Sequence, residues 1–390
     1  MTSTPARMVL TVGESSGDQL AADLAIHLRR QYPNIELAGI AGPAMQAAGV
    51  EPWYDLDVLG VMGLTEVISH LPRLLRLRRE LRERTLAWKP DAFIGVDAPD
   101  FNLGLARQLR QRGLKTVHYV SPTVWAWRAG RTKTVARSVD LLLALFPFEP
   151  PLYAAYGLDA RFVGHPLADQ MADRPTREQA REKLALKTDE TIIALLPGSR
   201  RSEIERHARL TMETAQWIRR QRNNARLLVL LADRRQEAYF IEQAGPDLEQ
   251  TGIEIVCEQT RTGLVSADVA CVASGTATLE AFLLECPLVA FYRLSPTTYW
   301  LARGLRLIRS AHIAMPNILQ GEEIIPEFVQ QQATAQALGQ AVVDWLEQPE
   351  RRENYRMIAQ KFRRQLAAGA GDNAARATLE LTGLVGEPAR

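Results

Sequence analysis

The sequence predicts an α/β protein made of two doubly wound domains, each with a parallel sheet covered by helices. Three observations support this fold class. Short apolar runs of strand length alternate with longer amphipathic segments, an order typical of βαβ units. The 390 residues are too many for one ordinary core and suit two domains. A polar stretch at 164–190, which contains Pro166 and Pro175, divides the apolar runs into two series.

The two series contain the strands that we expect in the two sheets. The first series comprises 8–12, 35–40, 92–96, 116–120, 141–145 and 160–164. The second comprises 191–196, 225–231, 252–257, 269–273 and 287–292. We expect a first domain over 1–166 and a second over 167–349, with helices at about 350–382 returning to the first domain. Ligands are expected at the carboxyl ends of the strands, in a cleft between the domains.

Composition excludes several classes of protein. The formal net charge is only +2, so the chain is not a polycation built to bind nucleic acid. Three cysteines without CxxC spacing predict neither a disulfide framework nor a zinc site, and the chain has no P-loop or GxGxxG motif. The N-terminal apolar run is too short for a signal peptide, and no run reaches the roughly 18 residues that span a bilayer. We expect a cytoplasmic protein, soluble or peripheral on a membrane.

Two turns in the second series are typical of anion-binding sites. The first is LLPGSR at 195–200, which ends a strand and precedes a helix expected to begin at Ser202. Ser202 and Glu205 have the spacing of a capping box. Gly198 lets a ligand approach the backbone, and Arg200 adds a charged donor beside the amides of the helix start. An ordinary turn with a solvated arginine is the alternative.

The second turn, ASGTATLEA at 273–281, also follows a strand and begins a helix. Its small residues present hydroxyls and amides at a helix N-terminus, where a diphosphate can bind. These residues are Ser274, Gly275, Thr276 and Ala277. Glu280 lies one turn further along the same helix face, where its carboxylate can accept hydrogen bonds from the hydroxyls of a ribose. The two turns together predict a nucleoside diphosphate site in the second domain.

An acidic turn in the first series is the best candidate for catalysis. FIGVDAPDFN at 93–102 places Asp97 at the carboxyl end of a strand, where a carboxylate can act as general base toward a sugar hydroxyl. Asp100 and Asn102 follow it. Asp100 also suits a helix cap, and either acid remains a candidate for taking the proton. The acids of Asp55-Leu-Asp57 are better explained as a surface loop than as a metal site.

Two basic amphipathic segments suit an anionic lipid surface. The first, at 67–84, combines many arginines with an apolar helical stripe of Val67, Leu71, Leu74 and Leu75, beside which lies the apolar Ile68. The second, at 291–312, has four arginines, several aromatic residues and no acid. Helices packed on their own domain with solvated arginines are the alternative.

Other aromatic and titratable residues carry weaker signals. Trp125 and Trp127 lie beside basic residues and suit a sugar platform or a phosphate site. His118 and His165 could titrate near neutrality, although single histidines are usually structural.

Taken together, the motifs resemble the lipid-A-disaccharide synthase family of glycosyltransferases. The stretches that carry the resemblance lie in order along most of the chain. They are GESSGD (13–18), AGPAMQAAG (41–49), VMGLTEV (61–67), VDAPDFN (96–102), HYVSPTVWAWR (118–128), FPFEP (146–150), GHPLAD (164–169), LLPGSR (195–200), ASGTATLE (273–280) and MPNIL (315–319). One departure is Ser15, where many relatives have alanine.

The resemblance implies a GT-B fold and a defined reaction. The enzyme would join UDP-2,3-diacylglucosamine to 2,3-diacylglucosamine 1-phosphate (lipid X), with inversion at the anomeric carbon, to give a β-1,6-linked disaccharide and UDP. Such enzymes work without a metal or cofactor and attach peripherally to the cytoplasmic face of the inner membrane. A homodimer is compatible with the sequence.

The resemblance also implies roles for individual residues. Asp97 matches the family's essential carboxylate, and Asn317 matches a functional asparagine near the donor. Arg200, the 274–277 turn and Glu280 would hold UDP, while the apolar residues of 67–75 would line an acyl groove. GESSGD looks like an acceptor-side turn, where Glu14, Ser16, Gly17 and Asp18 contact the sugar or order the cleft. Asp18 also suits a helix cap.

Two rival interpretations remain at this point. Another GT-B enzyme that acts on a UDP-sugar, such as a UDP-N-acetylglucosamine 2-epimerase, would share the nucleotide turns but need no acyl groove. A non-catalytic nucleotide- or lipid-binding protein would bind UDP without turnover and leave Asp97 without a chemical task.

Overall fold

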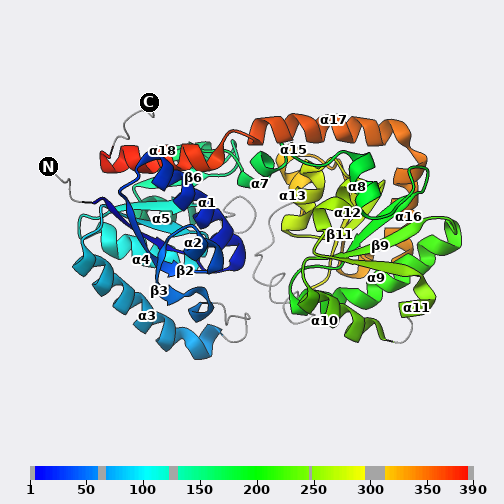
Figure 1. The fold of residues 1–390 in the computed structure, drawn as a ribbon, viewed down its shortest axis with the longest axis horizontal. Helices are drawn as coiled ribbons and strands as arrows, with labels where there is room; N and C mark the ends of the chain where they lie inside the picture. Colours follow the sequence, from blue (N-terminus) through cyan, green and yellow to red (C-terminus); the bar gives the residue numbers. More distant parts are fainter. Residues whose placement is uncertain (1–4, 60–66, 123–130, 246–247, 295–311, 385–390) are drawn as a thin grey trace. The chain divides into compact units, whose positions relative to one another are not determined.

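The computed structural model describes residues 5–59, 67–122, 131–245, 248–294 and 312–384. The chain forms two compact units (Figure 1), each of which is described by itself. Unit 1 comprises Met1–Asp169 and Gln365–Arg390, and unit 2 comprises Gln170–Arg364. Among the described residues, no helix is long and apolar enough to cross a membrane.

Unit 1 is built on a seven-stranded sheet in the order β3-β2-β1-β4-β5-β6-β7, with parallel neighbours throughout. The strands are β1 (Arg7–Thr11), β2 (Glu36–Ala41), β3 (Glu51–Asp55), β4 (Ala92–Val96), β5 (Lys115–Tyr119), β6 (Leu141–Ala144) and β7 (Asp159–Phe162). The helices are α1 (Ser15–Gln31), α2 (Pro43–Ala47), α3 (Val67–Trp88), α4 (Pro99–Arg110), α5 (Arg131–Ser138), α6 (Pro151–Ala154), α7 (Pro166–Gln170) and α18 (Ala370–Thr382), with a 3-10 turn at Leu56–Val58.

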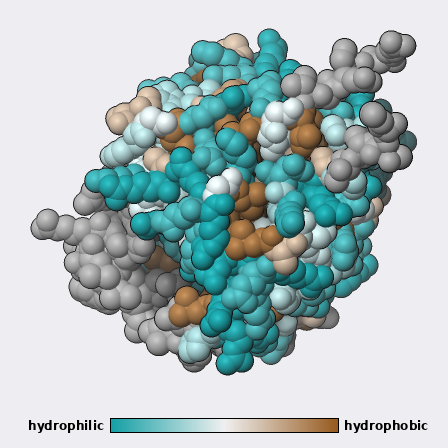
Figure 2. Space-filling view, turned by 90° about the vertical axis from the view of Figure 1, so that its left-hand side faces the viewer, coloured by the Kyte–Doolittle hydropathy of each residue, from teal (hydrophilic) through white to brown (hydrophobic). Residues whose placement is uncertain are grey.

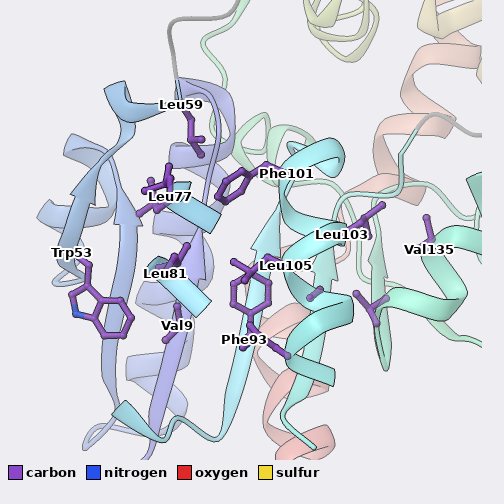
Figure 3. Close-up of a cluster of buried hydrophobic side chains, with 14 of the residues drawn as sticks. Val9, Trp53, Leu59, Leu77, Leu81, Phe93, Phe101, Leu103, Leu105 and Val135 are labelled. Carbon is purple, nitrogen blue, oxygen red and sulfur yellow. The ribbon is translucent and has the colours of Figure 1, made fainter. Parts of the chain in front are cut away.

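One hydrophobic core cluster of unit 1 lies between the sheet and the helices that cover one of its faces (Figure 3). Val9 of β1 and Phe93 of β4 are fully buried there. Leu77 and Leu81 of α3 meet them from the helix layer, because a spacing of four residues puts both side chains on one helix face. A buried apolar strand that is covered by helices on its faces reads as a nearly continuous hydrophobic run, which explains why β1 and β4 were easy to find in the sequence.

Unit 1 is completed by a segment that is distant in sequence. Helix α18 packs against α1, and its N-terminus is capped by Asp169, whose carboxylate accepts hydrogen bonds from the N–H of Gly369 (3.0 Å) and Ala370 (2.7 Å). The N–H of His165 donates to the carbonyl of Leu366 at 2.8 Å. A carboxylate at a helix N-terminus satisfies orphan amides and interacts favourably with the helix dipole, so the 164–169 turn fixes the returning chain.

Unit 2 repeats the same architecture with a six-stranded sheet in the order β10-β9-β8-β11-β12-β13, again parallel. The strands are β8 (Ile192–Leu196), β9 (Arg226–Leu231), β10 (Ile253–Cys257), β11 (Val269–Ala273), β12 (Leu288–Tyr292) and β13 (Glu327–Val329). The helices are α8 (Arg177–Lys183), α9 (Arg201–Gln221), α10 (Arg234–Ala244), α11 (Leu248–Thr251), α12 (Thr260–Ser266), α13 (Thr276–Leu283), α15 (Met315–Gln320), α16 (Ala335–Glu347) and α17 (Pro349–Leu366), with a 3-10 turn at Gln330–Gln332.

The predicted fold class is confirmed: both units are doubly wound α/β structures, and the strand predicted at each of the eleven apolar runs is present. Two strands of the structure were not expected, β3 and β13. Both lie at a sheet edge. β3 contains Pro52 and exposed residues, and β13 has only three residues. Edge strands tolerate proline and polar side chains, so neither has the apolar pattern of a central strand.

Candidate active site

Two turns of unit 1 meet at the carboxyl ends of β1 and β4, which are neighbours in the sheet. Gly13 lies in the turn after β1, and a Cβ added to it would lie 2.4 Å from the Cβ of Ala98 in the turn after β4. No side chain tolerates such a distance, so glycine is required at position 13. A Cβ added to Gly17 would lie 3.8 Å from the Cβ of Asp97. The structure thus brings the GESSGD and VDAPDFN motifs together.

The turn after β4 has strained backbone. Asp97 and Ala98 have φ angles of 50° and 42°, in the left-handed region, and the next strand end carries Val120 at φ 80°. Positive φ is uncommon for residues other than glycine, and for a β-branched valine it is an outlier. Each such residue costs about 1–3 kcal/mol, and such strain clusters at functional sites. The half-buried Asp97 therefore lies where strain has concentrated at the carboxyl edge of the sheet.

Asn102, in the first turn of α4, bonds the backbone of this turn. Its side chain is fully buried, and its Nδ2 donates to the carbonyl of Asp97 at 2.8 Å and to those of Val96 and Thr11 at 3.3 Å each. Its Oδ1 accepts from the hydroxyl of Thr11 at 2.7 Å. Asn102 was expected at the acceptor side; it lies in contact with the backbone of the site, and its amide group is occupied by these bonds.

Asp100 is placed differently from Asp97. It lies in the first turn of α4, its side chain is 87% exposed, and it forms an ion pair with Arg131. The backbone carbonyl of Asp100 accepts a hydrogen bond from Arg78 at 2.9 Å. An acid in the first turn of a helix is a common stabilising element. Of the two candidate acids, Asp97 alone lies on the strained turn.

Asp18 caps a helix, but a different one from the helix that contains it. Its side chain is buried, with 4% exposed. Its Oδ1 accepts from the N–H of Gly42 (3.0 Å) and Met45 (3.1 Å), and its Oδ2 accepts from Ala44 (2.9 Å). These amides belong to the start of α2, so Asp18 joins the first turn of α1 to the AGPAM turn after β2. Glu14 and Ser16, by contrast, are exposed at the start of α1.

Two buried histidines are neutral at physiological pH. Burial, together with the charge of the nearby Arg131, lowers the pKa of His118, on β5, to about 4. Burial also lowers the pKa of His165 to about 4. The expectation that either imidazole titrates near neutrality is therefore wrong, because a group taken out of water favours its uncharged form.

The apolar stripe predicted on α3 is only partly described. Leu74 is half-buried against the core, whereas Leu75 is 51% exposed. The side chains of Val67, Ile68 and Leu71 lie outside the described residues, as do Trp125, Trp127 and the segment 295–311. The exposed Leu75 lies between arginines at positions 73, 76 and 79, which are also exposed. Figure 2 shows a mainly hydrophilic face of the molecule, with hydrophobic residues in small separate areas.

In unit 2, the LLPGSR turn has a cap that the sequence analysis did not identify. Helix α9 begins at Arg201, one residue before the expected start. The carboxylate of Glu203 accepts from the N–H of Ser199 (3.0 Å) and Arg200 (3.3 Å). The predicted capping pair of Ser202 and Glu205 is therefore wrong. The carboxylate of Glu203 occupies the amides that we expected an anion to use, while the Arg200 side chain is 66% exposed.

Glu205, for its part, forms an ion pair with Arg201 at 2.7 Å on the surface of α9. Glu203 is the cap because the N-cap residue of α9 is Arg200, two residues before Ser202, so that the third helical residue is Glu203 and not Glu205.

His207 contacts the LLPGSR turn and was not predicted from the sequence. It is fully buried, its Nδ1 lies 2.8 Å from the carbonyl of Pro197, and its Nε2 accepts from the N–H of Arg293 at 3.2 Å. The Nδ1–H tautomer satisfies both contacts. Burial lowers the pKa of His207, so a neutral imidazole links the turn after β8 to the end of β12. Its position, the seventh residue of a long helix, gave no local signal.

The turn after β11 leads into a helix start with space beside its glycine. Gly275 precedes α13, and a Cβ added to it would meet none of the described residues within 4 Å. The first N–H groups of a helix have no acceptor within the helix, so those of Thr276 and Ala277 point away from α13. Ser274 uses its hydroxyl to donate to the carbonyl of Ile313 at 2.8 Å. Of the two predicted anion turns, only this one has no carboxylate bonded to its amides among the described residues.

Glu280 and Asn317 already have partners within unit 2. The carboxylate of Glu280 accepts from Arg261 at 3.0 Å. Asn317 is fully buried; it donates to the carbonyl of Ile325 and to Glu327, both at 2.9 Å, and it accepts from the N–H of Ile325 at 3.0 Å. Glu327 in turn accepts from two amides at 313–314, each at 2.9 Å. Asn317 thus ties the start of α15 to the strand β13.

Comparison with known proteins identifies the family. A family model described as lipid-A-disaccharide synthetase matches residues 8–381. The chain belongs to this family. The lipid-A-disaccharide synthase of Xanthomonas campestris pv. campestris (strain 8004) is 47% identical over 376 residues, which cover 96% of this chain and 86% of that protein. The synthase of Xylella fastidiosa (strain M12) is 43% identical, with coverage of 96% and 98%.

Solved structures with a similar fold identify the fold class of the chain. The UDP-GlcNAc 2-epimerase of Neisseria meningitidis, bound to UDP-GlcNAc, has a TM-score of 0.61 at 11% identity and covers 96% of this chain and 98% of its own. A glycosyltransferase from Rickettsia africae has a TM-score of 0.56 at 13% identity, with coverage of 98% and 99%. At such identities the likeness extends to the fold alone. The predicted GT-B fold is confirmed, and the epimerase alternative has no support beyond the fold.

Proposed function

We propose that this protein is a lipid-A-disaccharide synthase that transfers a diacylglucosaminyl group with inversion. The donor is UDP-2,3-diacylglucosamine and the acceptor is 2,3-diacylglucosamine 1-phosphate, lipid X. The products are the β-1,6-linked lipid A disaccharide 1-phosphate and UDP. Membership of the synthase family over residues 8–381 is combined with one observation that carries the proposal: Asp97 stands on a strained turn at the carboxyl edge of the first sheet.

Asp97 is the catalytic base in this proposal. Its carboxylate takes the proton of the acceptor 6-hydroxyl as that oxygen attacks the anomeric carbon of the donor. The new carbon–oxygen bond forms on the face opposite to UDP, the bond to the diphosphate breaks, and UDP leaves with its electron pair. A positioned base contributes typically about 10²–10⁴-fold to such a step. Asp100, exposed and paired with Arg131, is assigned to supporting α4.

The turn after β11 is assigned to the donor diphosphate. Its residues Gly275, Thr276 and Ala277 offer amides at a helix start, which stabilise the negative charge that develops on departing UDP. Ser274 shapes this turn through its bond to Ile313. Because Glu203 occupies the amides of the LLPGSR turn, we assign the exposed guanidinium of Arg200, and not its backbone, to the diphosphate.

The ribose is assigned to Glu280, which would exchange its bond with Arg261 for the ribose hydroxyls. Asn317 supports the donor site through the 313–327 segment, because its own polar atoms are already bonded. Donor binding is assigned to the second domain and acceptor binding to the first, which the returning residues from Gln365 onward complete, whereas 350–364 belong to unit 2. On the acceptor side, Glu14, Ser16 and Gly17 are assigned to the sugar, and Asp18 to ordering the turn.

The acyl chains and the membrane are assigned to α3. Its exposed leucine, Leu75, lies among exposed arginines, a combination that suits the boundary between anionic headgroups and acyl chains. The residues Val67, Ile68, Leu71 and Leu74 complete the proposed acyl groove. We accordingly assign the protein to the cytoplasmic face of the inner membrane. In this proposal the reaction needs no metal or cofactor. Light scattering distinguishes a homodimer from a monomer.

The proposal is tested by a direct assay of product. Purified protein is incubated with both substrates in detergent and EDTA, and the disaccharide 1-phosphate and UDP are measured for the wild type, Asp97→Asn and Asp100→Asn. We expect product from the wild type, a fall of at least about 100-fold for Asp97→Asn as expected of a lost general base, and near wild-type activity for Asp100→Asn. Absence of product from the wild type, or full activity of Asp97→Asn, would refute the proposal.

A further inference from the structure

Three residues form a row across the first sheet beneath the Asp97 turn. Thr11 of β1 pairs with Gly95 of β4, and Gly95 pairs with His118 of β5. Paired residues on neighbouring strands point to the same face of a sheet, and both side chains of this row are fully buried. Gly95 leaves a gap in the row, which Asn102 fills: a Cβ added to Gly95 would lie 2.8 Å from the Cβ of Asn102.

The amide of Asn102 has only one orientation that satisfies its neighbours. The carbonyls of Asp97, Val96 and Thr11 can only accept hydrogen bonds, so Nδ2 must face them. Oδ1 then faces the hydroxyl of Thr11, which donates to it at 2.7 Å. The Thr11 hydroxyl thus adds a bond on the other side of the amide and secures the orientation that bonds the carbonyl of Asp97. A buried network that is fully satisfied in this way is rigid.

We propose that Thr11 and Asn102 form a clamp that holds Asp97 in its left-handed conformation and so sets the direction of its carboxylate. The bond from Asn102 ends on the carbonyl between Asp97 and Ala98, the two residues with positive φ. Strained backbone persists only where its surroundings fix it. The inference rests on the proposed role of Asp97 as base. Asn102 is a positioning residue, because its buried side chain contacts the turn and not the sugar.

Thr11→Val tests the clamp, because valine keeps the shape of threonine and removes only the hydroxyl. We expect kcat to fall by about 10- to 100-fold, the scale of a slightly misplaced catalytic group, while KM for both substrates stays close to wild type. Thr11→Ser retains the hydroxyl and should restore kcat. Thr85→Val is the matched control: Thr85 is also fully buried in unit 1, its hydroxyl has no hydrogen-bond partner among the described residues, and its replacement should leave kcat unchanged.

Hydrogen exchange of the turn provides a readout that does not depend on activity. The N–H of Asp97 donates to the carbonyl of Tyr119 (2.9 Å), and the N–H of Asn102 donates to that of Ala98 (3.0 Å). Thr11→Val, but not Thr85→Val, should speed exchange in a peptide covering 96–102. Unchanged exchange and unchanged kcat in folded Thr11→Val would overturn the clamp, and so would a loss that Thr11→Ser does not restore. If Thr11→Val speeds exchange but the wild type shows no transferase activity, the clamp stands and the proposed function alone is refuted.

Discussion

Asp18 provides a sharp test of what the GESSGD turn does. If its carboxylate orders the turn, Asp18→Asn should lower the stability of unit 1 and leave acceptor binding intact. An asparagine whose oxygen takes the place of Oδ1 keeps the bonds to Gly42 and Met45. Its NH₂ group then faces the N–H of Ala44, which loses the acceptor that it now has at 2.9 Å.

The size of the effect follows from this one lost bond. A hydrogen bond to a charged group contributes about 1.5–3 kcal/mol, and a donor left without an acceptor adds to the loss. We therefore expect the free energy of unfolding of unit 1 to fall by about 2–3 kcal/mol. For a domain of about 150–250 residues, each kcal/mol lowers Tm by about 2–4 °C, so the first unit should melt about 4–12 °C earlier.

Differential scanning calorimetry measures this shift, with Asp57→Asn as the matched control because Asp57 is an exposed acid of the same unit. Steady-state kinetics at a temperature well below the transition should give a wild-type KM for lipid X. A variant that melts like the wild type but has a raised KM for lipid X would show that the Asp18 carboxylate binds the acceptor, and the structural argument would be refuted.

Two further predictions concern buried polar groups. Because burial lowers the pKa of His118 and His165 to about 4, the unfolded chain binds protons below about pH 6.5 that the folded chain does not. The free energy of unfolding should therefore fall as the pH drops from 6.5 to 4, by up to about 1.4 kcal/mol per pH unit for each histidine. Urea titrations at pH 5 and 7 measure this, and an equal slope in His165→Gln would contradict it. Asn317→Asp should destabilise unit 2 by about 3 kcal/mol, because it places a second carboxylate beside Glu327 inside the protein; unchanged urea unfolding would contradict this assignment.

The sheets could be predicted from the sequence because each central strand is apolar along its whole length. β11 is VACVA and every one of its residues is buried, so periodicity and length were sufficient. The edge strands β3 and β13 escaped because an edge strand does not need an apolar sequence. Their positions depend on pairing with β2 and β12, which the residues of the strands themselves do not encode.

The sequence predicted which motifs form the candidate site, but not the hydrogen-bond partners of the residues in them. A carboxylate directly after a buried strand marked Asp97, because the carboxyl end of a parallel strand is where ligands bind. The roles of Asp18 and Asn317 depend on amides that lie elsewhere in the chain, at 42–45 and 324–325. Local spacing shows that a residue can cap a helix, but it does not show which helix.

The choice of cap on α9 illustrates how small a difference decides such an assignment. Glu203 and Glu205 each lie three residues after a polar residue, Arg200 and Ser202 respectively. Because the helix starts at Arg201, Glu203 is the one that caps it. As a result, the LLPGSR amides are occupied by the protein's own carboxylate, which no pattern of residue types indicated.

The return of the chain to unit 1 has a consequence for the order of events during synthesis. Helix α18, which packs on α1, leaves the ribosome only after all of Gln170–Arg364 has been made. Until then, the face of α1 that carries His27 and Gln31 lacks its neighbour, and the carboxylate of Asp169 lacks the amides that it caps. The second unit is contiguous and can fold first on the ribosome, although its residues emerge later. The amino-terminal unit is thus the last to be finished, and a nascent chain that stalls before residue 370 would leave its proposed catalytic turn in an incomplete domain.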